Sequence, residues 1–249
     1  MFVSEGGAAR GRFVAFRASG LATLSKVRNR ILIAILAAGA LALGAATIAS
    51  GIVPIYENNF SSGAKVREIK KLSGGAACSK LHEDKRFVAL VKGGPTKCIF
   101  RTPVVGDGSG PDHQVAATAR VDKATSSKIR KQVYVGVGAR AAKKTGFELR
   151  VFPKRGRWEV HRSPTGTGFP VKGSSEDING VGKANEFRLT VFGNTVAAHI
   201  NGTKVMFRTD SNAAQVSGVN ATLVAAGEKK TQKTAKITFD SFRVRLPNP

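Results

Sequence analysis

Hydrophobic and polar residues alternate with a period of two along much of the chain from about residue 85 onward. The alternation is clearest in HQVAATARV (113–121), QVYVGVGAR (132–140), GFELRVF (146–152) and RWEVHR (157–162). Successive side chains of a β-strand point to opposite faces of its sheet, so this pattern predicts half-buried strands. We therefore expect antiparallel β-structure over these four segments.

Two tight turns divide the next alternating region into a three-stranded meander. The segments FRLTVF, TVAAHI and TKVMFR follow one another between residues 187 and 208, separated by Gly193-Asn194 and Asn201-Gly202. Asn-Gly between alternating runs is a strong hairpin signal, because a type I′ turn needs positive φ at both central residues. Two successive hairpins are therefore predicted here.

Two further strands are expected near the end of the chain, at 220–227 and at 235–246, the second with one break in its alternation. Together these patterns predict about eleven short strands and no convincing helix in this region. An open sheet of that many strands tends to curl or split, which favours two packed sheets. The sequence predicts an all-β, antiparallel sandwich.

An uncharged run of 23 residues, 31–53, interrupts the polar N-terminal region. As a helix at ~1.5 Å per residue it would cross a hydrocarbon core of ~30 Å, so it predicts one transmembrane helix. Residues 1–30 are basic, and Lys26, Arg28 and Arg30 adjoin the run directly. The positive-inside rule then places this tail in the cytoplasm and the C-terminal domain on the far side of the cell membrane. A signal peptide cleaved after Ala49 is the alternative.

The residues after the apolar run are interpreted as a stalk over 54–76, rich in Ser, Gly and Asn, in which AKVREIKKL could form two turns of helix. The exported domain would then occupy 77–249. It contains the chain's two cysteines, Cys78 and Cys98. An even number of cysteines outside the cytoplasm predicts one disulfide.

The charge is strongly unbalanced, with 40 Lys and Arg against 16 Asp and Glu, a net of +24. Such a balance favours an anionic partner. In the predicted compartment the candidates are an anionic cell-envelope polymer, a cell-wall polysaccharide and the membrane surface. Nucleic acid is excluded, because no recognition motif is present and the predicted compartment is wrong.

The meander and the last strand resemble a known family. Phe192-Gly193-Asn194, Ile200-Asn201-Gly202 and Phe239-Asp240 leading to Phe242-Arg243-Val244 are similar to the turn and strand motifs of concanavalin-A-like lectin/glucanase jelly rolls, especially the laminin-G-like and keto-disaccharide-hydrolase-like domains. The resemblance covers roughly 85–246. It implies a jelly roll, and its relatives include sugar binders, glycosidases and structural modules, so it does not decide function.

Catalysis has weak candidates. The acidic Glu-x-Asp-x-x-Glu cluster of laminarinase-type members is absent, and the nearest carboxylates are Glu148 and Glu159, outward on adjacent predicted strands. A glycosidase needs two carboxylates flanking the bond. Arg150 and Arg157 lie among them, so surface ion pairs are the favoured interpretation and a glycoside hydrolase is the alternative.

Sugar binding would use an exposed aromatic platform with polar neighbours. The outward-phase candidates are Tyr134, Phe152, Arg150, His161 and Arg188. The hypothesis is a platform built from these five side chains.

No cofactor is expected, with calcium as a weak candidate. Asp107 and Asp112 in GDGSGPDH (106–113) offer oxygen ligands, but EF-hand spacing is absent, and Gly and Asp are ordinary turn residues. The sequence thus predicts a membrane-anchored, extracytoplasmic, non-catalytic module that binds a glycan or anionic envelope component. A glycoside-processing enzyme and an accessory subunit of a membrane protein complex are the alternatives.

Overall fold

A computed structural model describes residues 54–103, 112–142, 145–164, 168–216, 218–229 and 233–246. The predicted basic tail (1–30) and transmembrane helix (31–53) lie outside these ranges. Within them, no helix has the length and apolar character needed to span a membrane.

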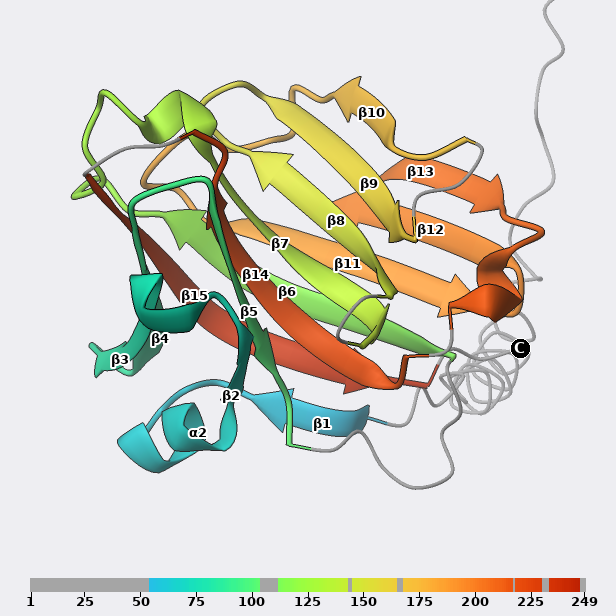
Figure 1. Ribbon diagram of the computed structural model, residues 1–249, viewed down its shortest axis with the longest axis horizontal. Coiled ribbons are helices and arrows are strands. Elements are labelled where there is room, and N and C mark those ends of the chain that lie inside the picture. Colours follow the sequence, from blue (N-terminus) through green and yellow to red (C-terminus); the bar gives the residue numbers. More distant parts are fainter. Residues whose placement is uncertain are drawn as a thin grey trace, which may run out of the picture. The chain divides into compact units, whose positions relative to one another are not determined.

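The described residues form fifteen strands in two packed antiparallel sheets (Figure 1). The eight-stranded sheet has the order β13 (Thr203–Thr209), β12 (Thr195–Ile200), β11 (Asn185–Phe192), β6 (His113–Val121), β15 (Thr234–Arg245), β4 (Arg86–Lys92) and β3 (Cys78–Glu83), and β1 (Pro54–Asn58) also pairs with β15. The seven-stranded sheet has the order β10 (Val171–Ser174), β9 (Arg157–Ser163), β8 (Gly146–Phe152), β7 (Val133–Ala141), β14 (Asn220–Gly227), β5 (Thr96–Arg101) and β2 (Lys70–Ser73). Helix α2 (Gly63–Glu68) and the short 3-10 turns η1 (Gly75–Ala77), η2 (Arg130–Gln132) and η3 (Ala213–Gln215) connect strands.

The alternating segments are strands, as the period-two pattern predicts. Strands β6, β8, β12 and β14 begin and end at the predicted residues, and burial alternates strictly along β6. The break in alternation in β15 is a register shift between Phe239 and Ser241. The all-β sandwich is confirmed, with more strands than the eleven expected.

The two predicted turns differ in their backbone φ angles. Asn201 and Gly202 both have positive φ, 50° and 85°, as a type I′ turn requires. At the other turn, between β11 and β12, Gly193 has φ 52°, and Asn194 is not left-handed. The Gly193-Asn194 turn therefore tolerates its Gly-Asn order, because only the glycine needs positive φ.

Residues 54–76, expected to form a stalk, are instead incorporated into the sandwich. Strand β1 pairs with β15, and β2 pairs with β5. The Ser62 side chain caps α2 by accepting a hydrogen bond from the Lys65 amide, and Phe60 and Ile69 are fully buried on either side of the helix. The predicted helical turns exist, but they fill a corner of the core.

The predicted disulfide between Cys78 and Cys98 is confirmed. It joins β3 of the eight-stranded sheet to β5 of the seven-stranded sheet, with the two Cα atoms 5.6 Å apart. The cysteines are 20 positions apart, and closing a loop of that size stabilises a fold by about 3 kcal/mol in the chain-entropy treatment.

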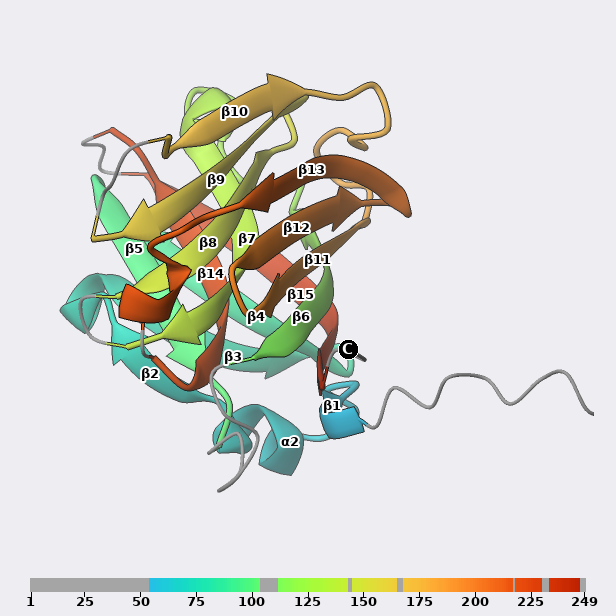
Figure 2. The same ribbon diagram turned by 90° about the vertical axis from the view of Figure 1, so that its right-hand side faces the viewer.

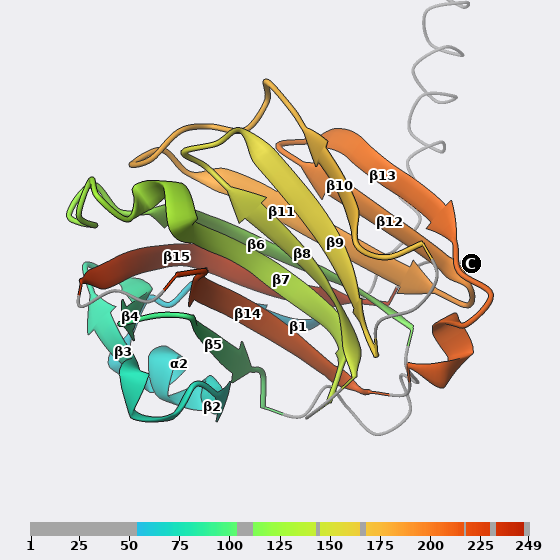
Figure 3. The same ribbon diagram turned by 45° about the horizontal axis from the view of Figure 1, so that its top comes forward.

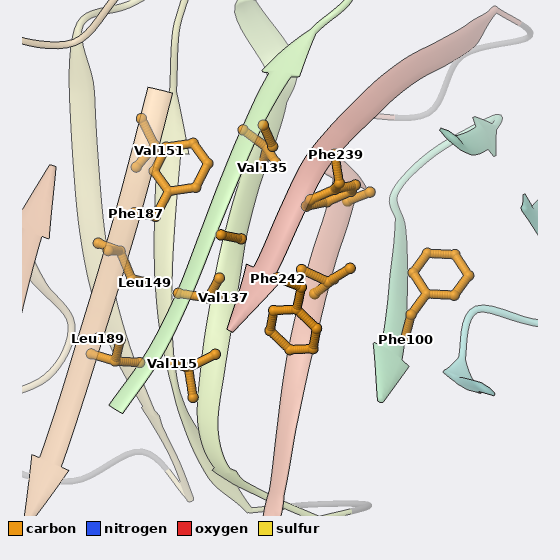
Figure 4. Packing of buried hydrophobic residues seen from close by; sticks show 14 of the residues in the cluster. Phe100, Val115, Val135, Val137, Leu149, Val151, Phe187, Leu189, Phe239 and Phe242 are labelled. Carbon is orange, nitrogen blue, oxygen red and sulfur yellow. The ribbon is translucent and has the colours of Figure 1, made fainter. Parts of the chain in front are cut away.

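The core lies between the sheets, where inward side chains of both interdigitate (Figure 4). Phe87 is its aromatic centre at one end, with its ring centroid 5.0 Å from that of Phe100 and 5.7 Å from that of Phe239. Leu149 and Leu189 pack near the middle of the same layer. Burial of each such side chain stabilises the fold by about 1.5–3 kcal/mol, which fixes the opposite face of each sheet as outward.

Candidate functional site

The outer face of the seven-stranded sheet brings most of the predicted site residues together. Strands β7, β8 and β9 lie side by side (Figure 3). Their register places Arg150 beside Glu159, and Glu148 beside His161. Tyr134 and Phe152 come from the same region of β7 and β8, and their ring centroids are 5.1 Å apart.

Arg188 does not belong to this group. It lies on β11 of the eight-stranded sheet, where it pairs in register with Ala116 and His199 and faces away from the core. The structure therefore brings four of the five predicted side chains together and leaves Arg188 on the other sheet, because outward phase alone does not tell which sheet a strand joins.

Tyr134 and Phe152 are also not an exposed platform. Only 5% of Tyr134 and 1% of Phe152 is exposed, and they form a small apolar cluster with Val224 and Ala226. Burial raises the pKa of the Tyr134 hydroxyl. The aromatic pair thus stabilises the outer face and offers no free ring surface to a sugar.

Arginine side chains cover the two rings. The guanidinium carbon of Arg150 lies 5.1 Å from the ring centroid of Tyr134, and that of Arg157 lies 4.6 Å from the centroid of Phe152. Arg155 lies 5.2 Å from the Phe152 centroid. Guanidinium groups stack favourably on aromatic faces, so the cations and the rings hold each other in place.

The two candidate carboxylates sit among cations, as the ion-pair interpretation expects. Glu148 accepts hydrogen bonds from Lys97 Nζ at 2.8 Å and from Arg150 Nε at 2.6 Å. Glu159 contacts Arg157 Nη2 at 3.0 Å. Both carboxylate side chains are largely buried, with 12% and 7% exposed. Salt bridges of this kind fix side-chain geometry more than exposed pairs do.

The environment keeps both carboxylates ionised. Burial would raise the pKa of Glu148, but Arg150 and Lys97 outweigh it and the pKa is lowered. Burial likewise opposes ionisation of Glu159, and the hydrogen bond from His161 together with the charge of Arg157 lowers its pKa. Neither group is therefore a proton donor near neutral pH.

His161 joins the two halves of this network through one ring nitrogen. Its Nε2 lies 3.0 Å from Arg150 Nη1 and 2.7 Å from Glu159 Oε2. Because a guanidinium only donates and a carboxylate only accepts, Nε2 accepts from Arg150 when bare and donates to Glu159 when protonated. Burial, and then the charge of Arg150, lowers the pKa of His161 despite the carboxylate.

A depression of about 100 Å³ opens beside this network. Its outward floor on β7 has no side chain at Gly138, where an added Cβ would meet Thr222 Oγ1 at 2.4 Å. It is lined by Leu72, Lys97, Ile99, Gly138, Ala141, Ala142, Thr145, Gly146, Phe147, Glu148, Ser163 and Thr222. The close approach of β14 explains the glycine, and the missing side chain leaves the hollow.

Lys97 is the residue that sequence reasoning missed. It lies on β5, remote in sequence from β8, and bonds Glu148 across the depression. The outward alternation of Lys97, Ile99 and Arg101 in TKCIFR (96–101) carried a signal for this face. Without the strand order, nothing in the sequence placed that strand near β8.

The weak calcium candidates divide between described and undescribed residues. Asp107 lies outside the described ranges. Asp112 forms an ion pair with Arg140 and accepts a hydrogen bond from the Gly193 amide at 3.1 Å. In the described part of the chain, no three His, Cys, Asp or Glu side chains are grouped as metal ligands would be.

No family model matches the chain, and no curated protein matches its sequence. Solved structures match its fold. A carbohydrate-binding module, CBM66 from Bacillus subtilis, aligns at 10% identity over 72% of this chain and 95% of that chain, with a TM-score of 0.52. The laminarinase catalytic domain from Thermotoga maritima MSB8 aligns at 9% identity over 79% and 99%, with a TM-score of 0.56. A protein of unknown function from Bacillus subtilis with a galectin-like fold aligns at 11% identity over 78% and 96%, with a TM-score of 0.54.

These neighbours have the concanavalin-A-like or galectin-like jelly roll, which confirms the fold that the sequence motifs resemble. At this identity they show architecture alone. The outer face of the seven-stranded sheet must therefore be interpreted from its own residues.

Proposed function

We propose that the outer face of the seven-stranded sheet binds an acidic glycan without cleaving it. The observation that carries the proposal is the depression beside Glu148, which Lys97 lines and which Arg150 adjoins through its ion pair with Glu148. Neighbours of the same fold include a carbohydrate-binding module and a laminarinase, which supports a glycan as the ligand class.

The charge of this face favours an anionic polymer over a neutral one. The outward cations Lys97, Arg101, Arg150, Arg155, Arg157 and Lys172 outnumber the carboxylates Glu148, Glu159 and Glu228. A positive field of this kind concentrates anionic ligands at the surface and strengthens their encounter. Uronate or phosphate substituents on a polysaccharide would supply the matching charge.

The size of the depression favours a polymer that lies along the sheet. Enclosed small-molecule pockets commonly measure about 300–1,000 Å³, whereas this depression measures about 100 Å³. It accommodates one substituent of a sugar, and the remaining contacts would come from the charged side chains beside it.

The protonation states argue for binding without hydrolysis. Glycosidases need one carboxyl group that stays protonated to donate to the leaving oxygen. Glu148 and Glu159 both have lowered pKa values because cations and hydrogen bonds stabilise their ionised forms. The glycoside-hydrolase alternative remains an outcome of the test below.

The proposal includes the cell-membrane location inferred from the sequence, with residues 31–53 as a single transmembrane anchor, the N-terminus in the cytoplasm and the domain outside it. The supporting observation is the uncharged run with Lys26, Arg28 and Arg30 before it. Protease added to intact cells should then degrade the domain and leave the first thirty residues protected. Protection of the domain would refute this location.

The binding test compares a charged polysaccharide with its neutralised form. The full-length protein should bind polygalacturonate and lose most of that binding when the carboxylates are methyl-esterified. Ser163 is exposed at the rim of the depression, so Ser163→Tyr should block it without disturbing the core. Ser61→Tyr, at an exposed serine between β1 and α2, is the matched control.

Three outcomes decide the proposal. Binding that Ser163→Tyr abolishes and Ser61→Tyr preserves supports the site. Equal binding by both variants refutes it, because retention of the polysaccharide would then not depend on the depression. Release of reducing ends from the polymer would replace the binding function with hydrolysis.

A further inference from the structure

A second basic site lies on the opposite side of the sandwich, on the outer face of the eight-stranded sheet. Strands β11, β6 and β15 are neighbours there (Figure 3). Ala116 of β6 pairs in register with Arg188 of β11 on one side and with Arg243 of β15 on the other. Adjacent strands lie about 4.8 Å apart, so the two arginines stand on either side of a small residue.

The same register adds a third arginine one step along the strands. Gln114, two residues before Ala116, pairs with Arg245 of β15. Residues two apart on a strand share a face, so Arg243 and Arg245 point to the same side. The result is a small depression of about 40 Å³, lined by Gln114, Ala116, Glu186, Arg188, Arg243 and Arg245.

The depression suits a single oxyanion group. Its volume is far below the about 300–1,000 Å³ of enclosed small-molecule pockets, so a small group and not a whole ligand fits inside it. A guanidinium presents planar donors that match the oxygen atoms of a phosphate or sulfate group. Three of them around an alanine floor provide more donors than one tetrahedral anion requires.

One of the three arginines, Arg188, retains an unused donor. Arg243 Nε contacts Glu57 Oε1 at 2.9 Å, at the exposed margin of the sheet. Nε of Arg188 is buried and, among the described residues, meets no hydrogen-bond acceptor. A buried donor without a partner costs free energy, so a shift of the Arg188 side chain that turned this donor toward a bound oxyanion would be favourable. Glu186 is the one carboxylate among the lining residues.

His199 reports the positive field around Arg188. It pairs in register with Arg188 on the same outer face. Burial lowers the pKa of His199, and the charges of Arg188 and Lys204 lower it further. An anion bound at Arg188 would offset those charges, so the ring gives a local readout of occupancy.

We propose that the depression around Ala116 binds the phosphate or sulfate group of an anionic ligand through Arg188, Arg243 and Arg245. The group could come from a soluble ester or from a lipid headgroup, and both present the same tetrahedral oxyanion. The site lies on the other sheet from the proposed glycan site, so the two are tested by different variants.

The test titrates the full-length protein with sodium phosphate at constant ionic strength, while NMR follows the imidazole signal of His199. We expect a saturable shift and a rise in the pKa of His199 at saturation. Arg188→Gln and Arg245→Gln should each weaken the apparent affinity about tenfold. Arg67→Gln, an exposed arginine on α2, is the matched control and should change nothing.

A variant that is expected to gain affinity keeps the test valid if the arginine variants misfold, because misfolding cannot tighten phosphate binding. Glu186→Gln removes the carboxylate at the rim and should tighten phosphate binding. Non-saturable shifts, or equal affinities for the wild type, Arg188→Gln and Glu186→Gln, would overturn the proposal.

Vesicles identify the source of the phosphate. Sedimentation with phosphatidylcholine vesicles containing phosphatidylglycerol, compared with pure phosphatidylcholine, tests a lipid headgroup. Loss of this sedimentation in Arg188→Gln, but not in Arg67→Gln, supports a headgroup at the site. Phosphate binding without any such difference supports a soluble ester at the same site.

Discussion

Phe152 and Phe207 both lie on outer faces of the sandwich, one on each sheet, and they differ completely in exposure. Phe152 is 1% exposed and Phe207 is 65% exposed. Phe152 packs against Tyr134 and is covered by Arg155 and Arg157. Phe207 has Lys204 near its ring and Ala197 opposite it in register. Side-chain cover, more than strand phase, therefore decides whether an outward aromatic residue is free to bind.

Two outward arginines, Arg150 and Arg188, one on each sheet, differ in their ion pairing. Glu148 on the seven-stranded sheet is held between Arg150 and Lys97. On the eight-stranded sheet, Arg188 forms no ion pair with any described residue. Arg150 thus has its geometry fixed by an internal ion pair, whereas Arg188 keeps its charge for an external ligand. The exposure of Phe207 also reflects the position of β13, which is the edge strand of its sheet (Figure 2).

The largest expected effect separates the two aromatic residues. Phe152→Ala should lower the free energy of unfolding by about 3–5 kcal/mol, as for a core phenylalanine, because it empties a covered cluster. Phe207→Ala should change it by less than about 0.5 kcal/mol. Urea denaturation measures both. Equal losses of unfolding free energy in the two variants would show that the cover of Arg155 and Arg157 does not make Phe152 part of the folded interior.

A smaller difference is expected between the two arginines. Arg150→Gln leaves the largely buried Glu148 with only Lys97 and uncovers Tyr134, so the free energy of unfolding should fall by about 3 kcal/mol. Arg188→Gln should alter it by no more than about 0.5 kcal/mol. If Arg188→Gln proved the more destabilising change, the contrast between a paired and an unpaired arginine would be wrong.

The paired carboxylate also predicts a pH dependence. The pKa of Glu148 is lowered from its ordinary 4.5, so its stabilising contribution is complete above pH 4.5 and is lost as pH falls through the lower, folded-state pKa. Glu148→Gln should therefore be less stable than the wild type by about 1.5–3 kcal/mol at pH 7. That difference should shrink below pH 4.5. The pKa of Glu159 is also lowered, but Glu159 is present in both proteins, so its contribution to the pH dependence of stability cancels in the comparison.

The control for this profile is Glu176→Gln, at an exposed loop carboxylate. Its difference from the wild type should stay small and constant across the same pH range. A Glu148→Gln difference that did not change between pH 7 and pH 3 would mean that the ion pairs with Lys97 and Arg150 add no net stability.

Much of the fold could be predicted from the sequence because its signals are local. Alternation in 113–121 and 146–152 and the Asn201-Gly202 turn depend on residues that are neighbours along the chain. The strands at 54–58 and 70–73 carry no such signal, since they are short and their pairing is decided by β15 and β5. Composition typical of a linker therefore concealed the two strands, although it allowed the helical turns between them to be predicted.

The candidate site was only partly predictable because it depends on which strands become neighbours. Outward phase grouped Glu148, Glu159 and Arg150 correctly, since β8 and β9 follow each other in sequence. It could not separate Arg188, which joins the other sheet, or bring Lys97 across from β5. Nor does phase indicate that an arginine will cover an outward ring.

The smallest expected effect concerns the ion pair at the margin of the arginine depression. Glu57 and Arg243 have side chains 54% and 45% exposed, and such pairs contribute about 0–1 kcal/mol. Glu57→Gln should thus leave the urea midpoint nearly unchanged while it frees Arg243 Nε and removes a nearby negative charge. Phosphate affinity, followed at His199, should then rise a few-fold, and salt should weaken the gain. Lower phosphate affinity in this variant would mean that Glu57 positions Arg243 for the anion and does not compete with it.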